Sequence, residues 1–210
     1  MAMSCLQSTD RLFDLLSKKA FRQSDTPEFN LSSGACSHFF FDCKKVSLNP
    51  EGAFLIGEAI FEKIKSLPVQ GVGGLTTGAD PIATAVSLIS YIREKPIDAF
   101  IVRKERKEHG TRQQIEGPLT PGANLVVVED VVTTGGSTLR TINILRAEGY
   151  TVIKVIALMD RLEGGAEKIK ADGTPFESLY TMDDFKNAST SPIRRKPESR
   201  GLDLGDMDSR

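Results

Sequence analysis

The clearest pattern in this chain is an alternation of short apolar runs and helix-period segments between residues 69 and 160. The run Val126-Val127-Val128 is β-branched throughout, as expected for a strand that is buried on both faces. Strands are predicted at Val69 to Gly73, Ala99 to Val102, residues 125–128 and Val152 to Met159. Helices are predicted at residues 4–22, from Asn49-Pro50 onward, after a cap at Asp80-Pro81, and from about 137 to 147, ended by Gly149. This alternation predicts the α/β class, with a central, mostly parallel sheet flanked by helices.

The segment from Phe29 to Val46 has a different pattern. Its polar turn and aromatic run predict a hairpin or strand pair at one edge of the fold. The consecutive phenylalanines Phe39 to Phe41 cannot all face one core, because alternate side chains of a strand point in opposite directions. At least one of them must cover another element or a flat ligand, and the pattern leaves both alternatives open.

Composition narrows the class of protein. With 210 residues, 40% of them hydrophobic and 26% charged, the chain is large enough for one α/β domain. Its formal net charge of −1 gives no support for nucleic-acid binding. No apolar run reaches membrane-spanning length and the N-terminus lacks a signal pattern, so we expect a cytoplasmic protein without a membrane partner. Residues 187–210 mix charges with Ser, Pro and Gly and are expected to form a disordered tail.

The cysteines give little evidence for a disulfide or a metal. Cys5, Cys36 and Cys43 form an odd set without paired spacing, which indicates reduced thiols. Cys36 and Cys43 with His38 suggest a zinc site as an alternative, but a fourth ligand is missing.

A candidate phosphate site follows the β-branched run. The side chains of residues 133–137 are small, so the backbone N–H groups can approach a ligand closely, and the helix predicted behind them adds partial positive charge. Glu129 and Asp130 lie just upstream and would repel phosphate, so they must face hydroxyls, a cation or developing positive charge. A phosphorylated ribose fits both halves of this pattern. The alternative is an ordinary strand–turn–helix with a solvated acidic turn.

A cationic segment, residues 103–112, leaves the carboxyl end of the strand predicted at 99–102. It has four cations in its first five residues, followed by His109 and Gly110. Open α/β sheets bind ligands at this edge, and a pyrophosphate leaving group needs cations as its charge develops. A loop that closes over the ligand would also exclude water. A solvated charged loop is the alternative.

The stretch from Val126 to Thr138 resembles the phosphoribosyl-pyrophosphate (PRPP) signature of the type I phosphoribosyltransferases. A sharper resemblance, over most of residues 10–186, is to the orotate phosphoribosyltransferases. It rests on Leu31-Ser32-Ser33-Gly34 with Phe39-Phe40-Phe41-Asp42, on Gly73 to Pro81, on Arg103-Lys104 with Lys107 and His109-Gly110, and on Asp160-Arg161. The resemblance implies the type I phosphoribosyltransferase fold, with one domain at 1–186 that comprises a small N-terminal hood at about 22–48 and a core at about 52–186.

The resemblance also implies roles for individual residues. Catalysis would fall to Lys104, Lys107, His109 and Asp130. PRPP would be bound by Arg103, Lys104, Lys107, His109, Glu129, Asp130, Val131, Val132, Thr133, Thr134, Gly135, Gly136 and Ser137. Orotate would contact Thr133 and Arg161, whose planar fork matches a carboxylate, although a salt bridge between Arg161 and Asp160 is the alternative.

The implied reaction transfers the phosphoribosyl group from PRPP to orotate, giving orotidine 5′-monophosphate and pyrophosphate in pyrimidine biosynthesis. Mg²⁺ would be the cofactor, held through PRPP and not by the protein directly. Lys104 would reach the neighbouring subunit's site, which implies a homodimer with shared active sites. The alternatives are a transferase for another base and a non-catalytic, PRPP-sensing regulator.

The chain departs from the family's pattern in two places. Many members have Lys where Ser32 stands, and Lys44 or Lys45 could substitute for it. Thr76 and Thr77 occupy a loop where some members place Lys. We interpret these departures as marks of a different branch of the family.

Overall fold

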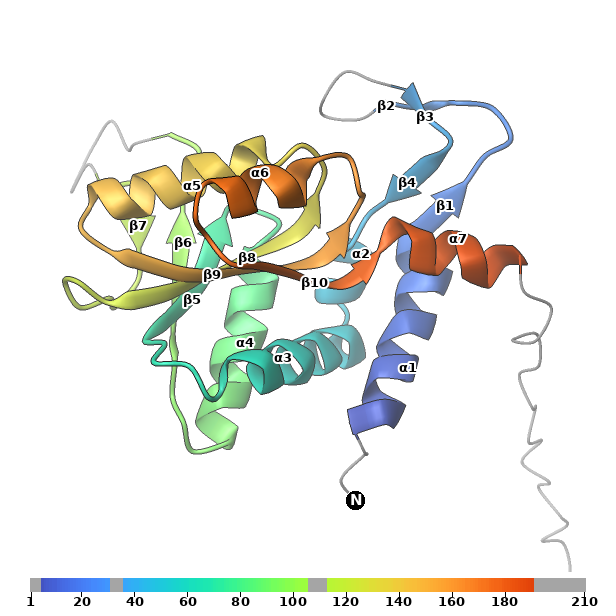
Figure 1. Cartoon of the computed structure of the whole chain (residues 1–210). Helices are drawn as coiled ribbons and strands as arrows, with labels where there is room; N and C mark the ends of the chain where they lie inside the picture. Colours follow the sequence, from blue (N-terminus) through green and yellow to red (C-terminus); the bar gives the residue numbers. More distant parts are fainter. Residues whose placement is uncertain (1–4, 31–35, 106–112, 191–210) are drawn as a thin grey trace, which may run out of the picture.

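The computed structural model describes residues 5–30, 36–105 and 113–190. Its centre is a six-stranded sheet in the order β10-β9-β8-β5-β6-β7 (Figure 1). Neighbouring strands are parallel except for β6 and β7, which are antiparallel. The strands are β5 (Gly71–Leu75), β6 (Asp98–Val102), β7 (Ile115–Glu116), β8 (Asn124–Val132), β9 (Thr151–Asp160) and β10 (Phe176–Thr181). The predicted α/β class with a mostly parallel sheet is confirmed.

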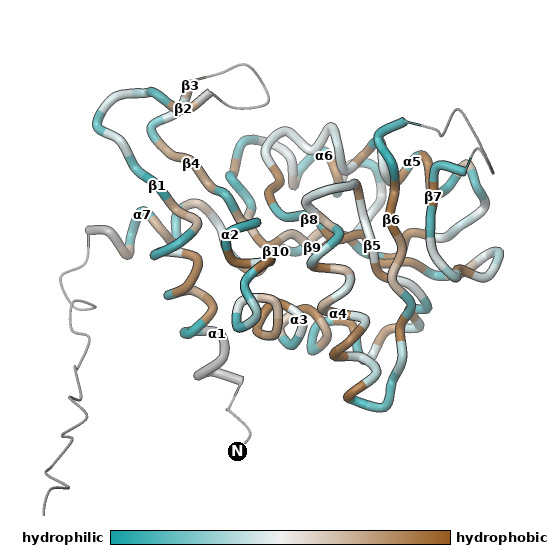
Figure 2. The backbone as a smooth tube through the Cα atoms, turned by 180° about the vertical axis from the view of Figure 1, so that it is seen from behind, coloured by the Kyte–Doolittle hydropathy of each residue, from teal (hydrophilic) through white to brown (hydrophobic). Residues whose placement is uncertain are grey.

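Helices cover both faces of the sheet. On one side lie α3 (Pro50–Ile64) and α4 (Asp80–Ile92), and on the other α5 (Gly136–Ala147) and α6 (Gly165–Ala171) (Figure 1). Strand β8 alternates between the two layers: Val126 and Val128 pack in the cluster with α3 and α4, whereas Leu125 and Val127 pack in the cluster with α5. The central strands are accordingly mostly hydrophobic in Figure 2. This arrangement leaves the strand ends, and not the strand faces, available to a ligand.

Two of the predicted helices, which start near Asn49 and Asp80, lie on the same face of the sheet, and the start of the second differs in detail. Asn49 caps α3 as its side chain accepts a hydrogen bond from the Gly52 N–H at 3.1 Å. Asp80 is instead the first residue of α4, with Ala79 in the cap position. The Asp80 carboxylate accepts a hydrogen bond from the Thr76 hydroxyl at 2.7 Å, so it ties the loop after β5 to the helix.

The N-terminal part contains α1 (Cys5–Leu15), a π-helical turn (Leu16–Ala20), β1 (Phe21–Gln23), β2 (Phe29–Asn30), β3 (Cys36–Ser37), β4 (Phe39–Phe41) and α2 (Lys44–Ser47). Antiparallel pairing joins β1 to β4 and β2 to β3, which forms the strand pairs expected in the hood. The helix predicted to continue to residue 22 ends at Ala20, because Phe21 is drawn into the ribbon opposite Phe41.

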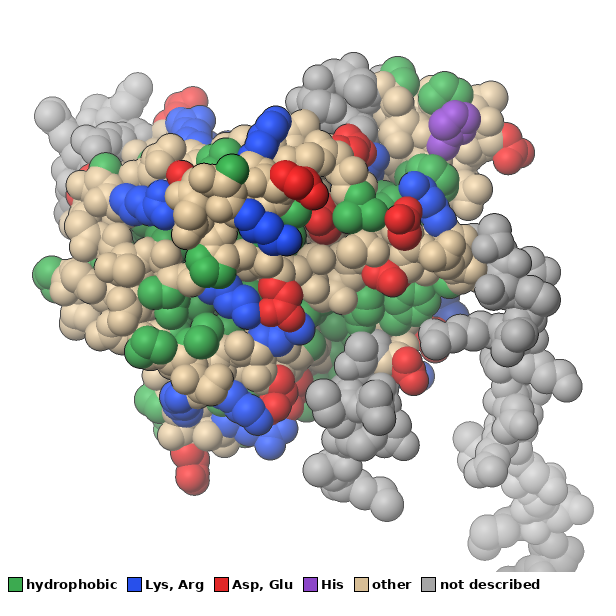
Figure 3. All heavy atoms as spheres, viewed as in Figure 1, with side chains coloured by type: hydrophobic (Ala, Val, Ile, Leu, Met, Phe, Trp, Pro, Cys, Tyr) green, Lys and Arg blue, Asp and Glu red, His purple; other side chains and the backbone are tan. Residues whose placement is uncertain are grey.

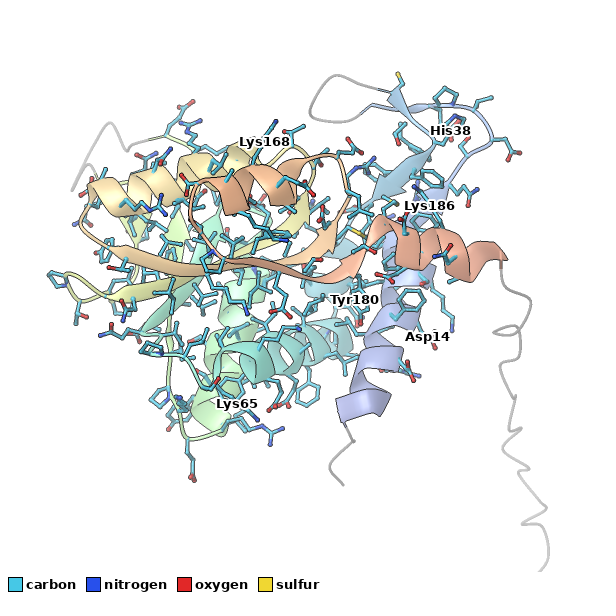
Figure 4. All side chains as sticks on the ribbon, in the orientation of Figure 1. Asp14, His38, Lys65, Lys168, Tyr180 and Lys186 are labelled. Atoms are coloured by element: carbon cyan, nitrogen blue, oxygen red, sulfur yellow. The ribbon has the colours of Figure 1, made fainter. Side chains whose placement is uncertain are left out.

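The three consecutive phenylalanines divide as strand geometry requires. The rings of Phe39 and Phe41 both lie 5.9 Å from the ring of Phe21, and the Phe40 ring stacks on Phe29 at 5.5 Å. The hood therefore has an aromatic core of its own, the first of the two alternatives. Helix α7 (Met182–Thr190) closes it: Phe185 packs on Phe41, and the Lys186 ammonium lies 5.2 Å from the Phe39 ring (Figure 4).

Several boundaries differ from those predicted. Strand β5 begins at Gly71, two positions later than the predicted start at Val69. Strand β8 extends through the acidic pair, Glu129 and Asp130, to Val132. Helix α7 continues to Thr190, past the domain boundary expected at 186, and residues 191–210 lie outside the described part of the chain. Strands β7 and β10 and helix α6 were not predicted, because each is short or only partly buried.

Candidate active site

A loop that could hold a phosphate connects β8 to α5; we call residues 133–137 the phosphate cradle. Thr134, Gly136 and Ser137 are exposed there. Gly135 has a φ of 75°, and a Cβ on it would lie 2.9 Å from the Gly165 carbonyl oxygen, so only glycine fits without strain. No side chain among the described residues caps α5, which leaves the N–H groups of its first turn available to an anion.

Glu129 is directed toward the start of α5. Its side chain is buried, and its carboxyl group accepts hydrogen bonds from the hydroxyls of Thr138 at 3.2 Å and Ser137 at 3.5 Å. Burial and the neighbouring charge of Asp130 raise the pKa of Glu129 to about 8, although the two hydroxyl donors oppose this shift. Burial therefore favours the protonated form of Glu129, and its carboxyl group supports the phosphate cradle through Thr138 and Ser137.

Asp130 is the more accessible carboxylate of the pair. It is half-buried at the end of β8, and its backbone carbonyl accepts a hydrogen bond from the buried Cys43 thiol at 3.5 Å. Gly78 faces its side chain so closely that a Cβ there would lie 2.6 Å from the carboxyl group. The Lys44 ammonium lies 3.8 Å from one Asp130 oxygen and 3.3 Å from Asp42. Two segments besides β8, at residues 43–44 and at Gly78, thus fix the place of Asp130.

Of the two lysines considered as substitutes at Ser32, only Lys44 faces the acidic pair. Burial lowers the pKa of Lys44, but Asp130 and Asp42 more than offset this, so the pKa lies above its usual value. Lys45 is exposed and forms no ion pair within the described residues. Ser32 itself lies outside them.

Arg161 joins the sheet to the hood. The residue is only 7% exposed, and its guanidinium forms an ion pair with Glu163 at 2.8 Å. It also donates to the Ser37 hydroxyl at 3.2 Å and to the Phe39 carbonyl at 3.4 Å. The alternative of an ion pair with Asp160 is wrong, because the Asp160 carboxylate accepts the Leu162 N–H and Arg161 turns to Glu163 instead.

Only the beginning of the cationic segment is described. Arg103 follows β6 and pairs with Glu116 at 3.1 Å, and Lys104 is exposed beside it. The Lys104 carbonyl accepts a hydrogen bond from Arg140 of α5 at 2.6 Å. Lys107 and His109 lie outside the described residues. Both Arg103 and Lys104 emerge at the carboxyl edge of the sheet, the edge that also carries Asp130 and Arg161.

The residues considered as a zinc site do not come together. Cys43 is buried beneath Asp130, whereas Cys36 is exposed on the hood. His38 contacts the Ser24 carbonyl at 3.2 Å and lies on the outer part of the hood in Figure 4. Within the described ranges, no three His, Cys, Asp or Glu side chains form a group that could hold a metal ion.

Sequence reasoning missed Glu116, Arg140 and Glu163, which stand outside the stretches with a recognisable pattern. Glu116 and Arg140 reach the site through tertiary contacts, and Glu163 pairs with Arg161 two positions earlier. Gly78 lies within the stretch Gly73 to Pro81 that carries the resemblance, but no role was predicted for it. Val131 and Val132, which were expected at PRPP, lie in β8; Val132 is buried in the core and Val131 partly so. Either could reach a ligand only through its backbone.

Comparison of the sequence and the structure with known proteins shows the family of this chain. Residues 48–189 match the model of the phosphoribosyl transferase domain. Orotate phosphoribosyltransferase of Aquifex aeolicus is 45% identical over 176 residues, covering 84% of this chain and 96% of that protein. The enzyme of the same name from a Nostoc species is 48% identical over 177 residues, covering 84% of each. Among solved structures, Mycobacterium tuberculosis orotate phosphoribosyltransferase superposes with a TM-score of 0.74 at 34% identity, covering 85% of this chain and 98% of that one. With its family model, its relatives and its fold in agreement, the chain belongs to the phosphoribosyltransferase domain family and, within it, to the orotate phosphoribosyltransferases.

Proposed function

We propose that this protein transfers the 5-phosphoribosyl group of PRPP to orotate, yielding orotidine 5′-monophosphate and pyrophosphate for pyrimidine biosynthesis. The observation that carries the proposal is the convergence on one sheet edge of an open phosphate cradle, an accessible carboxylate and buried Arg161. A solved structure of the M. tuberculosis relative contains PRPP and superposes with a TM-score of 0.70 at 33% identity. The 5-phosphate of that ligand would suit the N–H groups of the cradle, and its ribose hydroxyls would suit the Asp130 carboxylate.

In this proposal the two ends of PRPP are bound by different chemistry. The N–H groups of residues 133–137 receive the 5-phosphate at the N-terminus of α5. Asp130 accepts hydrogen bonds from the ribose hydroxyls, and its negative charge favours the positive charge that develops on the sugar. Arg103 and Lys104, with Lys107 and His109 outside the described part, contact the pyrophosphate. The ion pair of Arg103 with Glu116 would then be shared with the ligand or exchanged for it.

Mg²⁺ would bind together with PRPP. The hard oxygen atoms of pyrophosphate and ribose suit this ion, so PRPP itself and not a protein side chain would hold it. When bound, the ion neutralises part of the charge on the leaving group. Asp130 would orient the sugar, and the cations at 103 and 104 would take up the remaining pyrophosphate charge.

Arg161 would determine the base. Its guanidinium already spans the hood and the core, and its planar cationic fork suits the carboxylate of orotate, a planar anion. A ring nitrogen of orotate then attacks the anomeric carbon and gives up its proton to pyrophosphate or solvent, while the C–O bond to pyrophosphate breaks and pyrophosphate leaves with the bonding electrons. Thr133 of the phosphate cradle is half-buried and would contact the base.

We propose further that the enzyme is a homodimer whose subunits share active sites through Lys104. Leu88, Tyr91 and Ile92 support an interface, since they lie on one face of α4 and are 60%, 75% and 60% exposed. If Lys104 acts across the interface, mixing inactive Lys104→Ala with inactive Asp130→Asn should restore activity, because hybrid dimers hold one site with both native residues. Absence of recovery after verified subunit exchange would place Lys104 in its own subunit's site.

The direct test of the function is a spectrophotometric assay of orotate consumption with PRPP and Mg²⁺. Turnover of orotate but not of uracil or adenine is expected. Use of another base in place of orotate would assign the protein to a different transferase. Binding of PRPP without turnover of any base would favour a regulator; against this alternative, positive and negative side chains are interspersed on the face seen in Figure 3.

A cytoplasmic location completes the proposal. Among the described residues, no helix is both long enough and apolar enough to cross a membrane. Fractionation of cells that produce the full chain would test the location directly.

A further inference from the structure

The stem of the cationic segment is held from two sides. On the sheet side, the Arg103 N–H donates to the Gln114 carbonyl at 2.9 Å, and the Gln114 side-chain amide donates back to the Arg103 carbonyl at 3.1 Å. On the helix side, Arg140 of α5 donates to the Lys104 carbonyl at 2.6 Å. The antiparallel register of β6 and β7 ends at Val102 and Ile115, so these contacts continue beyond the regular ladder.

Arg140 and Gln114 also line the same surface groove, which begins at Gly136 of the phosphate cradle and follows α5. Arg140 stands one helical turn after Gly136. One rigid helix therefore carries both the N-terminus that faces the 5-phosphate and the guanidinium that holds the cationic stem. The position of the Lys104 backbone is thus fixed relative to the cradle as well as relative to the sheet.

A contrast within α5 shows that the contact is not a general property of its arginines. Arg146, later on the same helix, forms an ion pair with Asp172 at 2.8 Å and a hydrogen bond to Thr174 at 2.8 Å. Those partners belong to the connection between α6 and β10, away from the cationic segment. Arg146 therefore serves packing of the helical layer and makes a matched control.

We propose that Arg140 is a positioning residue: it fixes the backbone at Lys104 relative to helix α5 of its own subunit, and so sets how far Lys104 reaches from the core toward the pyrophosphate of PRPP. The inference rests on the proposed function. PRPP carries a 5-phosphate and a 1-pyrophosphate on one ribose, so the cations that bind its pyrophosphate must be held at a fixed position relative to the cradle that binds its 5-phosphate. A shift of a cation by about 1 Å at such a site is enough to lower the rate about 10²-fold. Loss of one exposed hydrogen bond should cause part of that shift.

The test compares Arg140→Ala, Arg140→Lys and Arg146→Ala in the full chain. Arg140→Ala should lower kcat about tenfold, as expected for loss of one charge-assisted hydrogen bond, and should weaken binding of Mg²⁺·PRPP in the absence of any base. Arg140→Lys keeps a cationic donor and should recover most of both quantities. Arg146→Ala should lower the melting temperature without changing kcat.

A double-mutant cycle separates positioning from a general structural effect. If Arg140 acts through Lys104, Arg140→Ala should add little to the loss caused by Lys104→Ala. Equal losses from Arg140→Ala in the native and Lys104→Ala backgrounds, or no recovery with Arg140→Lys, would overturn the proposal. The cycle can be measured as the affinity for Mg²⁺·PRPP, which needs no base. If the protein did not use orotate, the proposed function would be refuted, but the same cycle would still test the inference about Arg140. A native protein that does not bind Mg²⁺·PRPP would overturn both.

Discussion

The phosphate cradle grows out of a strand that is hydrogen-bonded on both sides, to β5 and to β9, whereas the hood rests on two-stranded ribbons. The cradle offers backbone N–H groups whose directions are set by Gly135 and α5. The hood is joined to the active site by side chains: Arg161 binds Ser37 and Phe39, and Lys44 and Cys43 contact Asp130. Changes at the strand ends of the core should therefore affect PRPP, and changes at the joints to the hood should affect the base or the link between the two.

The largest effect is expected at Asp130, the carboxylate of the core that would face the ribose of PRPP. Asp130→Asn keeps the shape of the side chain but removes the negative charge, so turnover should fall roughly 10²–10³-fold, as for loss of one preorganised electrostatic group. Steady-state assays of orotate consumption measure this loss. Asp98→Asn is a matched control, because Asp98 is exposed at the opposite end of a parallel strand. Near-native turnover of Asp130→Asn would remove the acidic pair from the mechanism.

The joint between core and hood should respond differently. Arg161→Ala removes a buried guanidinium that binds two hood groups, a loss of about 2–3 kcal/mol, or roughly 30- to 150-fold in the KM for orotate. Affinity for Mg²⁺·PRPP, measured by calorimetry, should change little, since the cradle is built on β8 and α5. The control is Arg93→Ala, because Arg93 pairs with Glu58 on the surface of the α3–α4 layer. Equal losses for orotate and PRPP would show that Arg161 holds the whole site and not the hood side alone.

The same contrast explains what the sequence could predict. The elements around the cradle were predicted because strand, acidic pair, small loop and helix start follow one another along the chain, although β8 extends to Val132 and α5 begins at Gly136. The hood was predicted as a strand pair, but its joints were not, because Arg161 and Phe39 are 122 positions apart and no local pattern links them. Lys44 was considered beside Lys45, and only tertiary structure distinguishes the one that faces Asp130.

Local patterns also failed where burial is incomplete. Strand β10 is half-buried at most positions, so it shows neither the alternation of an amphipathic strand nor the apolar run of a buried one. Helix α6 spans seven residues, too few for a helical period to be recognised. The prediction that Asp80 caps α4 is wrong for a local reason, because the side chain accepts a hydrogen bond from the Thr76 hydroxyl four positions earlier.

The third prediction concerns the buried member of the acidic pair. Burial raises the pKa of Glu129 from 4.5 to about 8, so the folded protein keeps this proton over a range in which the unfolded chain has lost it. The unfolded state then binds fewer protons between about pH 4.5 and 8, and the free energy of unfolding falls as the pH rises through this window. Glu129→Gln should flatten the fall, by about 1–2 kcal/mol between pH 6 and 8. Denaturant unfolding at several pH values tests it, and parallel profiles for the two proteins would contradict a buried, protonated Glu129.

The smallest effect is expected at Lys44, the cation between hood and cradle. The side chain is 47% exposed, so its ion pairs with Asp42 and Asp130 are screened by solvent and contribute at most about 1 kcal/mol. Lys44→Ala leaves these two carboxylates without their cation beside a site that must receive a polyanion. We therefore expect Mg²⁺·PRPP to bind about two- to fivefold more weakly, measured by calorimetry at low salt, where such interactions are least screened.

Two variants distinguish this electrostatic role from a change in packing at α2. Lys44→Arg preserves the charge and should bind PRPP as the native protein does, and Lys45→Ala removes an exposed neighbour that forms no ion pair among the described residues. The difference between Lys44→Ala and the native protein should also shrink as salt is added, because exposed charges are screened over about 10 Å at 0.1 M. Tighter binding of PRPP by Lys44→Ala would mean the reverse, namely that Lys44 competes with the ribose for Asp130. In that case the hood would restrain the core site until the ligand displaces the lysine.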